Sequence, residues 1–246
     1  MLHQEMQLQG QWLFRWRSYL PLLFFSLFIP AFGEFQYLFG SYTANMIGNV
    51  FCLFIGLLGL FVRCLVIGYV PVNTSGRNTK EQVADSLNTS GMYSMTRNPL
   101  YLGNFLMWSA PILLLYHEWL YLIYTLAFIL YYERITMAEE KFLAEKFGAI
   151  YYDWSVKTPF LFPRFFRWYK PELAFSFKTV IRREYHGFYG LIAAMTTLGT
   201  IGESVIHRQF ILDPFWIGLF IVGTVIYFII RIFVKTTRLL KVEGRP

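Results

Sequence analysis

Long uncharged stretches alternate with polar segments along this chain. The first two stretches cover residues 18–33 and 35–62, and three more cover residues 100–116, 187–202 and 214–230. About 20 consecutive apolar residues cross the hydrocarbon layer of a bilayer as one α-helix. The pattern therefore predicts an all-α, polytopic membrane bundle of about six transmembrane helices, over residues 19–39, 44–70, 100–116, 119–132, 187–205 and 214–234.

The fourth of these predicted spans is short. As a helix, residues 119–132 are only about 21 Å long, at about 1.5 Å per residue. We therefore expect the helix to continue toward Ala138, or the bilayer to be thinner there. In either case Arg134, Glu139 and Glu140 lie at the membrane surface, where the polar loop 71–99 also emerges.

The charge distribution supports a membrane protein and predicts its orientation. Charged residues make up 15% of the chain, whereas soluble domains have about 25%. Residues 133–186 hold ten Lys and Arg residues, and loop 71–99 adds Arg77, Lys80 and Arg97, but the opposite side holds only Arg208. By the positive-inside rule, both termini and both polar regions face the cytoplasm, and we expect a bacterial inner membrane protein. The net charge of +7 then reflects sidedness, and not nucleic-acid binding.

The residues that usually bind metals form no recognisable pattern. Cys52 and Cys64 both lie in the second predicted span, and the four histidines are scattered at the ends of segments. This spacing predicts neither a disulfide framework nor a metal site.

Two motifs carry the candidate chemistry. Residues 97–103 read RNPLYLG at the start of the third span, and residues 139–148 read EEKFLAEKFG. Pro99 suits the first turn of a helix, and Gly103 allows a backbone or a flat ligand to approach closely. The N-terminus of this helix offers free N–H groups and a partial positive charge, which suit a carboxylate.

This pair of motifs resembles the signature of the isoprenylcysteine carboxyl methyltransferases and their phospholipid methyltransferase relatives. The resemblance covers roughly residues 45 to 163. It implies an integral membrane enzyme that uses S-adenosylmethionine, in a core of residues 45–163 between an N-terminal span (1–44) and a basic segment with two further spans (164–246). It also implies a cofactor pocket that is lined by Leu87, Asn88, Tyr93, Asn98, Pro99, Leu100, Tyr101 and Glu139, to which the backbone argument adds Gly103. The family commonly has His where this chain has Asn98, which cannot titrate.

The candidate catalytic residues are Arg97, Arg134 and Glu140. Guanidinium groups suit carboxylate or phosphate recognition, but Arg97 could instead pair with Glu139 or Glu140, and Arg134 could be a positive-inside anchor. Arg63, inside the second span, is a functional candidate because charges are rare at such depth, although a pair with Glu34 would explain it equally well.

Methyl transfer is an in-line displacement that demands alignment more than covalent help. A carboxylate or phosphate oxygen needs no base, whereas an amine must first lose a proton, and Glu139 or Glu140 would have to take it. The sequence therefore favours O-methylation of a lipid or lipidated acceptor. A phospholipid amine N-methyltransferase and a non-catalytic membrane scaffold or transporter are the alternatives.

Two further segments border the expected site. Residues 139–152 could form an amphipathic surface helix that closes the pocket. Residues 164–183 interleave basic and aromatic side chains, which either anchor the chain at the membrane surface or present a phosphorylated lipid.

Overall fold

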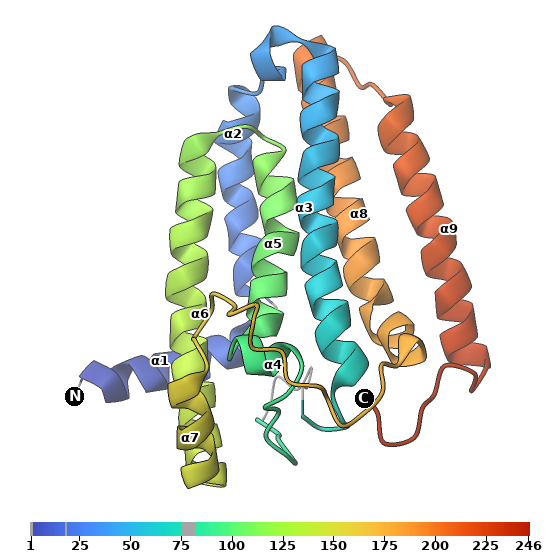
Figure 1. Cartoon of the computed structure of the whole chain (residues 1–246). Helices are drawn as coiled ribbons and strands as arrows, with labels where there is room; N and C mark the ends of the chain where they lie inside the picture. The colour runs from blue at the N-terminus through green and yellow to red at the C-terminus, as the bar shows by residue number, and fades with distance from the viewer. Residues whose placement is uncertain (1, 18, 75–81) are drawn as a thin grey trace.

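The fold is an all-helical bundle in the part of the chain that the structure, a computed structural model, describes: residues 2–17, 19–74 and 82–246. Figure 1 shows the long helices running side by side, with both termini at the same end. The α-helices, in chain order, are α1 (Leu2–Trp16), α2 (Phe28–Gly33), α3 (Tyr42–Tyr69), α4 (Met92–Met95), α5 (Pro99–Leu113), α6 (Glu118–Phe147), α7 (Ala149–Lys157), α8 (Phe177–His207) and α9 (Pro214–Thr236).

Three of the described helices, α3, α8 and α9, are long and apolar enough to cross a membrane. Helix α5 has only 15 residues. Helix α6 has 30 residues, but Glu133 and Arg134 interrupt its apolar part. The helical class is thus confirmed, and three of the predicted spans correspond to helices of sufficient length.

The first predicted span, residues 19–39, is not one continuous helix. A 3₁₀ segment (Leu20–Leu27) leads into α2, and a second short 3₁₀ segment (Leu38–Gly40) precedes α3. Pro30 lies in the first turn of α2. A helix can begin there without losing a hydrogen bond, because the first backbone N–H groups have no partner inside the helix.

Helices α3 and α5 pack closely through glycines. A Cβ atom on Gly59 would lie 2.4 Å from the backbone nitrogen of Met107, and one on Gly103 would lie 2.9 Å from the carbonyl oxygen of Gly59. Such small residues let helix backbones approach each other inside a membrane. This contact sets the position of the α5 N-terminus, which carries the first motif.

Helix α6 runs without a break through the second motif. Residues 139–152 are therefore not one helix but divide between α6 and α7, whereas Phe142, Leu143 and Tyr151 line the cavity, as expected for a segment that closes it. The chain turns only at Gly148, whose φ of 53° favours glycine, and α7 follows. The expectation that the helix of the fourth predicted span continues past Arg134 is confirmed, because the apolar residues 119–132 and the pair Glu139–Glu140 belong to one continuous helix.

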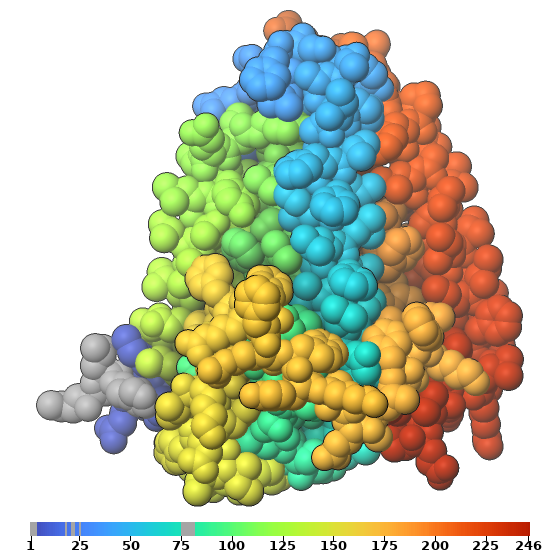
Figure 2. Space-filling view, in the orientation of Figure 1, coloured from blue at the N-terminus to red at the C-terminus, as the bar shows by residue number. Residues whose placement is uncertain are grey.

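Residues 158–176, which we call the strap, connect α7 to α8. In Figure 2 the strap lies on the surface of the lower part of the bundle, across α3 and α5. Backbone hydrogen bonds join it to the segment before α5: Gly91 N to Tyr169 O (2.8 Å), Arg164 N to Met95 O (3.0 Å) and Arg97 N to Pro159 O (2.9 Å). The strap therefore fixes the backbone of the first motif.

Candidate functional site

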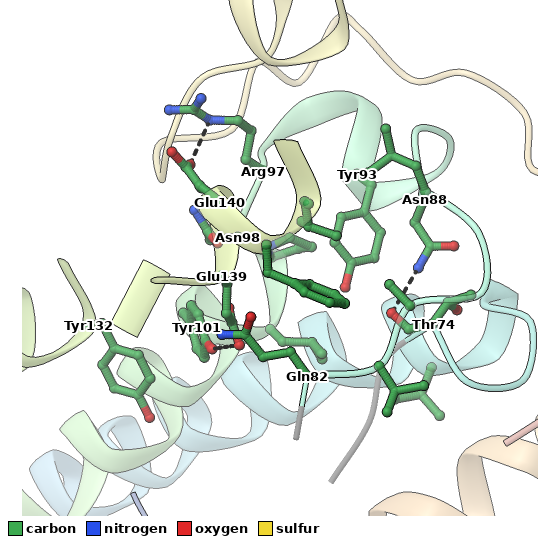
Figure 3. Close-up of a pocket in the computed structure, with 18 of the residues that line it drawn as sticks. Thr74, Gln82, Asn88, Tyr93, Arg97, Asn98, Tyr101, Tyr132, Glu139 and Glu140 are labelled. Atoms are coloured by element: carbon green, nitrogen blue, oxygen red, sulfur yellow. Dashed lines mark hydrogen bonds and ion pairs between the residues drawn. The ribbon is translucent and has the colours of Figure 1, made fainter. Parts of the chain in front are cut away.

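A cavity of about 600 Å³ lies at the end of the bundle where both termini are found. Its walls come from helices α1, α3, α5, α6, α7 and α8 and from the polar segment before α5. Figure 3 shows side chains from α5, from α6 and from the polar segment before α5 converging on the cavity. The residues expected from sequence that line it are Leu87, Asn88, Tyr93, Arg97, Asn98, Pro99, Leu100, Tyr101, Glu139 and Glu140.

Tyr101 and Glu139 join the two motifs. The Tyr101 hydroxyl donates a hydrogen bond of 2.8 Å to Oε1 of Glu139, and Nη1 of Arg17 lies 3.9 Å from the same oxygen. The Glu139 side chain is 28% exposed, but it is exposed to the cavity. Burial among protein atoms raises the pKa of this carboxyl group, while Tyr101 and Arg17 oppose the shift. A carboxylate at this position can accept further hydrogen bonds from a polar ligand.

Arg97 and Glu140 form the second polar pair. Their Nε and Oε1 atoms are 3.4 Å apart, yet neither atom has a hydrogen-bond partner among the described residues. The guanidinium and the carboxylate thus form an ion pair, but their geometry is not that of a hydrogen bond. Burial raises the pKa of Glu140, and Arg97 lowers it in part. Of the alternatives for Arg97, pairing with Glu140 is the one observed.

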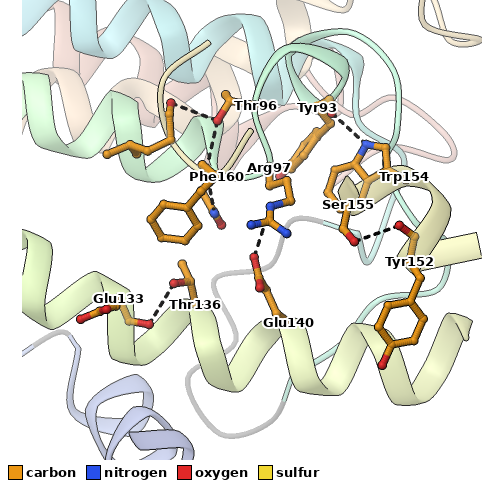
Figure 4. A network of polar contacts seen from close by, with 12 residues as sticks. Tyr93, Thr96, Arg97, Glu133, Thr136, Glu140, Tyr152, Trp154, Ser155 and Phe160 are labelled. Carbon is orange, nitrogen blue, oxygen red and sulfur yellow. Dashed lines mark hydrogen bonds and ion pairs between the residues drawn. The ribbon is translucent and has the colours of Figure 1, made fainter. Parts of the chain in front are cut away.

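The strap holds Arg97 and Asn98 in place. Asn98 donates its side-chain N–H to the carbonyl oxygen of Phe160 at 3.0 Å, and the Arg97 guanidinium lies 5.9 Å from the Phe160 ring centroid. Figure 4 shows Arg97 between Phe160 and Glu140. Cation–π contacts of this kind stabilise by about 0.5–1 kcal/mol at exposed sites. The orientation of Arg97 therefore depends on a segment more than 60 residues away in sequence.

Tyr93 and Asn88 form the opposite wall. The Trp154 indole N–H donates to the carbonyl oxygen of Tyr93 at 3.0 Å, and the Asn88 side chain reaches the carbonyl oxygen of Thr74 at 3.4 Å. Burial raises the pKa of the Tyr93 hydroxyl; Glu139 adds to the shift, and Arg63 opposes it. Arg77 and Lys80 of the expected cytoplasmic loop lie outside the described residues.

A polar node of three residues completes the cavity wall. Arg63 donates from Nε and Nη2 to the two carboxylate oxygens of Glu184, at 2.7 and 2.8 Å, and from Nη1 to Oδ1 of Asn104 at 2.5 Å. Arg63 comes from α3, Asn104 from α5 and Glu184 from α8, and all three line the cavity. The bidentate geometry is the strongest form of such a pair.

The alternative pair between Arg63 and Glu34 is wrong. Glu34 precedes the N-terminus of α3, whereas Arg63 lies about 30 Å further along this helix, at about 1.5 Å per residue. Glu34 is exposed, and α8 packs against α3 at the level of Arg63.

Arg134 and Gly103 do not line the cavity. Arg134 donates to Oε2 of Glu133 at 2.7 Å and to Oε1 of Gln9 at 3.3 Å, so its contacts join α6 to α1. A Cβ atom on Gly103 would lie 2.6 Å from Cγ of Arg63. Gly103 thus makes room for the Arg63 side chain, and any effect it has on a ligand is indirect.

Sequence reasoning missed several lining residues. Phe14 lies in α1 and Arg17 directly follows this helix, Asn104 belongs to the predicted span 100–116, and Glu184 precedes the predicted span 187–205. The available signal for Glu184 is an acidic residue inside a basic run, directly before an apolar stretch. In the part of the chain that the structure describes, no group of three His, Cys, Asp or Glu side chains could hold a metal ion.

Comparison with known proteins gives one match. Neither the curated proteins nor the solved structures contain a match to this chain. A family model does match, over the segment that contributes Arg63, Arg97, Tyr101 and Glu139 to the cavity. This result confirms the resemblance indicated by the two motifs: residues 50–150 match the model of the phospholipid methyltransferase family.

Proposed function

We propose that this protein is a membrane methyltransferase that moves a methyl group from S-adenosylmethionine to a lipid or a lipidated acceptor. The observation that carries the proposal is the hydrogen bond from Tyr101 to Glu139, because it brings the two family motifs to one cavity. A volume of about 600 Å³ lies in the range of small-molecule sites, about 300–1,000 Å³. A passive scaffold would not need these motifs to share a polar cavity.

The donor would be held by Glu139, Tyr101 and the opposite wall. The Glu139 carboxylate can accept hydrogen bonds from hydroxyl or ammonium groups, and Leu87, Leu100 and Tyr93 offer apolar and aromatic surface to an adenine ring. When bound, S-adenosylmethionine supplies a methyl group on a sulfonium, which becomes a neutral thioether as the methyl carbon bonds to the acceptor. The protein's task is to align the acceptor atom with the methyl carbon.

An anionic oxygen is the acceptor that we favour. Such an oxygen is already deprotonated near neutral pH, so the site needs a cation to hold it and no base. Arg97 meets this need, because its Nε lacks a hydrogen-bond partner among the described residues and the strap fixes its backbone. Arg134 has no support for the same role, since its contacts are with α1 and Glu133.

One observation favours an amine acceptor as the second candidate. Burial raises the pKa of Glu140, and a carboxylate with a raised pKa is a better proton acceptor near neutral pH. Glu140 could then take a proton from a phospholipid amine, and the matched family model is that of phospholipid methyltransferases.

The membrane arrangement is part of the proposal. We propose the six-span layout, in which α5 and the apolar N-terminal part of α6 form a hairpin of two short spans, with the cavity on the cytoplasmic side. The shared end of both termini supports an even number of crossings. The division into residues 1–44, 45–163 and 164–246 is retained, with Glu184 as a contribution of the third region to the cavity.

The experiment uses the full chain purified in detergent. Saturable binding of radiolabelled S-adenosylmethionine is expected, and Glu139→Gln should weaken it, whereas Glu145→Gln, on the exposed side of the same helix, should not. Incubation with a lipid extract and mass spectrometry should reveal a product that is heavier by one CH₂ group. Fragmentation then locates the added methyl on a phosphate or carboxyl oxygen, or on an amine. Absence of saturable donor binding would leave the scaffold alternative.

A further inference from the structure

The polar node of Arg63, Asn104 and Glu184 has more hydrogen-bonding capacity than its internal contacts use. A guanidinium has five N–H donors, and Arg63 directs three of them to Glu184 and Asn104. A carboxylate has about four lone-pair sites, of which Arg63 uses two. Both side chains line the cavity. One anionic and one cationic group of a ligand can therefore find a partner side by side.

The surroundings of the node leave space for these side chains. A Cβ atom on Gly103 would lie 2.6 Å from Cγ of Arg63, and one on Gly187 would lie 3.3 Å from Oε2 of Glu184. The glycines on α5 and α8 thus allow the pair to form at this depth. Three helices fix its geometry, so that a ligand would meet a preorganised pair of charges.

Packing alone does not account for an ion pair at this position. Replacing a buried ion pair with apolar residues of similar volume is often neutral or stabilising, and charged side chains at membrane depth commonly mark functional sites. Glu184 is only 4% exposed, and Arg63 is 17% exposed. Because Arg63 and Glu184 lie in the cavity wall, a ligand in the cavity could contact both buried charges.

We propose that Arg63 and Glu184 form a subsite for a zwitterionic group, in which Arg63 binds the anion and Glu184 binds the ammonium. This inference rests on the proposed function. Two ligands carry this chemistry: the amino-acid end of the methyl donor and the headgroup of a zwitterionic phospholipid. Asn104 is a positioning residue, because it holds the guanidinium from the side opposite Glu184.

The test compares two nucleosides that differ in the amino-acid end. S-adenosylhomocysteine carries the ammonium and the carboxylate, and methylthioadenosine lacks both. Binding of each to the detergent-purified full chain is measured by calorimetry for wild type, Glu184→Gln and Arg63→Lys. Retention of phosphatidylethanolamine and of phosphatidylglycerol is measured by native mass spectrometry. Arg63→Lys keeps the charge but loses the planar fork, and methylthioadenosine binding reports whether each variant is folded.

The matched control is Glu203→Gln, the same substitution on the same helix. Glu203 is buried and accepts a hydrogen bond of 2.6 Å from Tyr37, and it does not line the cavity. This control should lower the melting temperature and leave all four ligand affinities unchanged.

If the donor supplies the zwitterion, Glu184→Gln should weaken S-adenosylhomocysteine binding by about tenfold to a hundredfold, as expected for hydrogen bonds to charged groups, without changing methylthioadenosine binding. If the lipid supplies it, only phosphatidylethanolamine retention should fall. If the two variants changed the binding of all ligands equally, or changed none, the inference would be overturned, and the polar node would have a structural role only. Failure of the wild type to bind either nucleoside would instead refute the proposed function.

Discussion

The hydroxyl of Tyr101 on α5 donates a 2.8 Å hydrogen bond to Glu139 on α6. Their positions are 38 residues apart in sequence, and the contact makes one cavity wall out of two motifs. The Tyr101 ring also packs against Tyr132, with ring centroids 4.4 Å apart. The hydroxyl and the ring can therefore be tested separately.

Tyr101→Phe should weaken donor binding about threefold to tenfold and lower the free energy of unfolding by about 1–3 kcal/mol, because a buried carboxylate loses a donor. Calorimetry and thermal unfolding measure the two effects. The control is Tyr116→Phe, since Tyr116 donates to Oδ1 of Asn49 at 2.7 Å but lies outside this cavity. It should lower stability alone. Unchanged donor binding in Tyr101→Phe would remove Tyr101 from the cofactor site.

Donor binding should depend on pH through Glu139. Because burial raises the pKa of its carboxyl group, protonation occurs at a pH above the ordinary value for Glu of about 4.3. Donor affinity should therefore fall as the pH decreases through this raised pKa, and Glu139→Gln should remove the dependence. Titration of the dissociation constant between pH 8 and pH 5 checks this, with Glu145→Gln as a control that keeps the wild-type profile.

The contribution of Glu139 to folding stability should depend on pH in the opposite direction to donor affinity. Since the folded-state pKa of Glu139 is raised, the neutral carboxyl is favoured in the folded protein. Its stabilising contribution is present below the unfolded-state pKa and is lost as the pH rises through the folded-state pKa. Glu139→Gln should therefore raise the melting temperature relative to wild type near pH 8, and the difference should shrink on acidification. A difference that is constant with pH would contradict the burial of this group.

Arg97→Gln should slow methyl transfer by about tenfold to a hundredfold and leave donor binding within about twofold of wild type, because the guanidinium is expected to hold the acceptor, where a charged hydrogen bond contributes about 1.5–3 kcal/mol. Turnover with a lipid extract and donor affinity are measured on the same preparation. Arg134→Gln is the matched control, because Arg134 bonds with Gln9 and Glu133 away from the cavity. If Arg134→Gln lost turnover and Arg97→Gln kept it, the two assignments would have to be exchanged.

Gly103→Ala should destabilise the protein by about 1–3 kcal/mol, as is typical of overpacking. The new methyl group would lie 2.6 Å from Cγ of Arg63 and 2.9 Å from the Gly59 carbonyl oxygen. Gly190→Ala, where nothing lies within 4 Å of the added Cβ, should instead be neutral or stabilising by up to about 1 kcal/mol. Thermal unfolding in detergent distinguishes them, and an unchanged melting temperature in Gly103→Ala would show that α3 and α5 can separate at this point.

The sequence allowed the helical class and much of the cavity wall to be predicted. Apolar runs predict α3, α8 and α9. In a helix that crosses a membrane the backbone polar groups bond within the helix, and the side chains that face lipid must be apolar. The motif spacing predicted that residues from loop 71–99 and from Glu139–Glu140 would meet, since both leave the membrane at one surface. Periodicity and charge sidedness were sufficient for these inferences.

Other parts depend on how the helices face one another, which a single sequence does not encode in a local pattern. The partner of Arg63 proved to be Glu184 on α8 instead of Glu34, because α8 packs beside the C-terminal part of α3. Likewise, Arg17 reaches the cavity because α1 packs across α6. The break at Gly148, and not at Glu139, was missed because a helix can tolerate two carboxylates in sequence when each finds a separate partner.

The strap and Glu184 both lie beyond residue 150, where the family match ends. During synthesis, the segment that resembles other methyltransferases would emerge with Arg63 unneutralised and with the backbone of residues 91–97 lacking its hydrogen-bonding partners in the strap. A fragment cut at that boundary would therefore lack part of the cavity wall, and we expect that an expressed fragment must extend at least as far as the middle of α8 to keep the cavity intact.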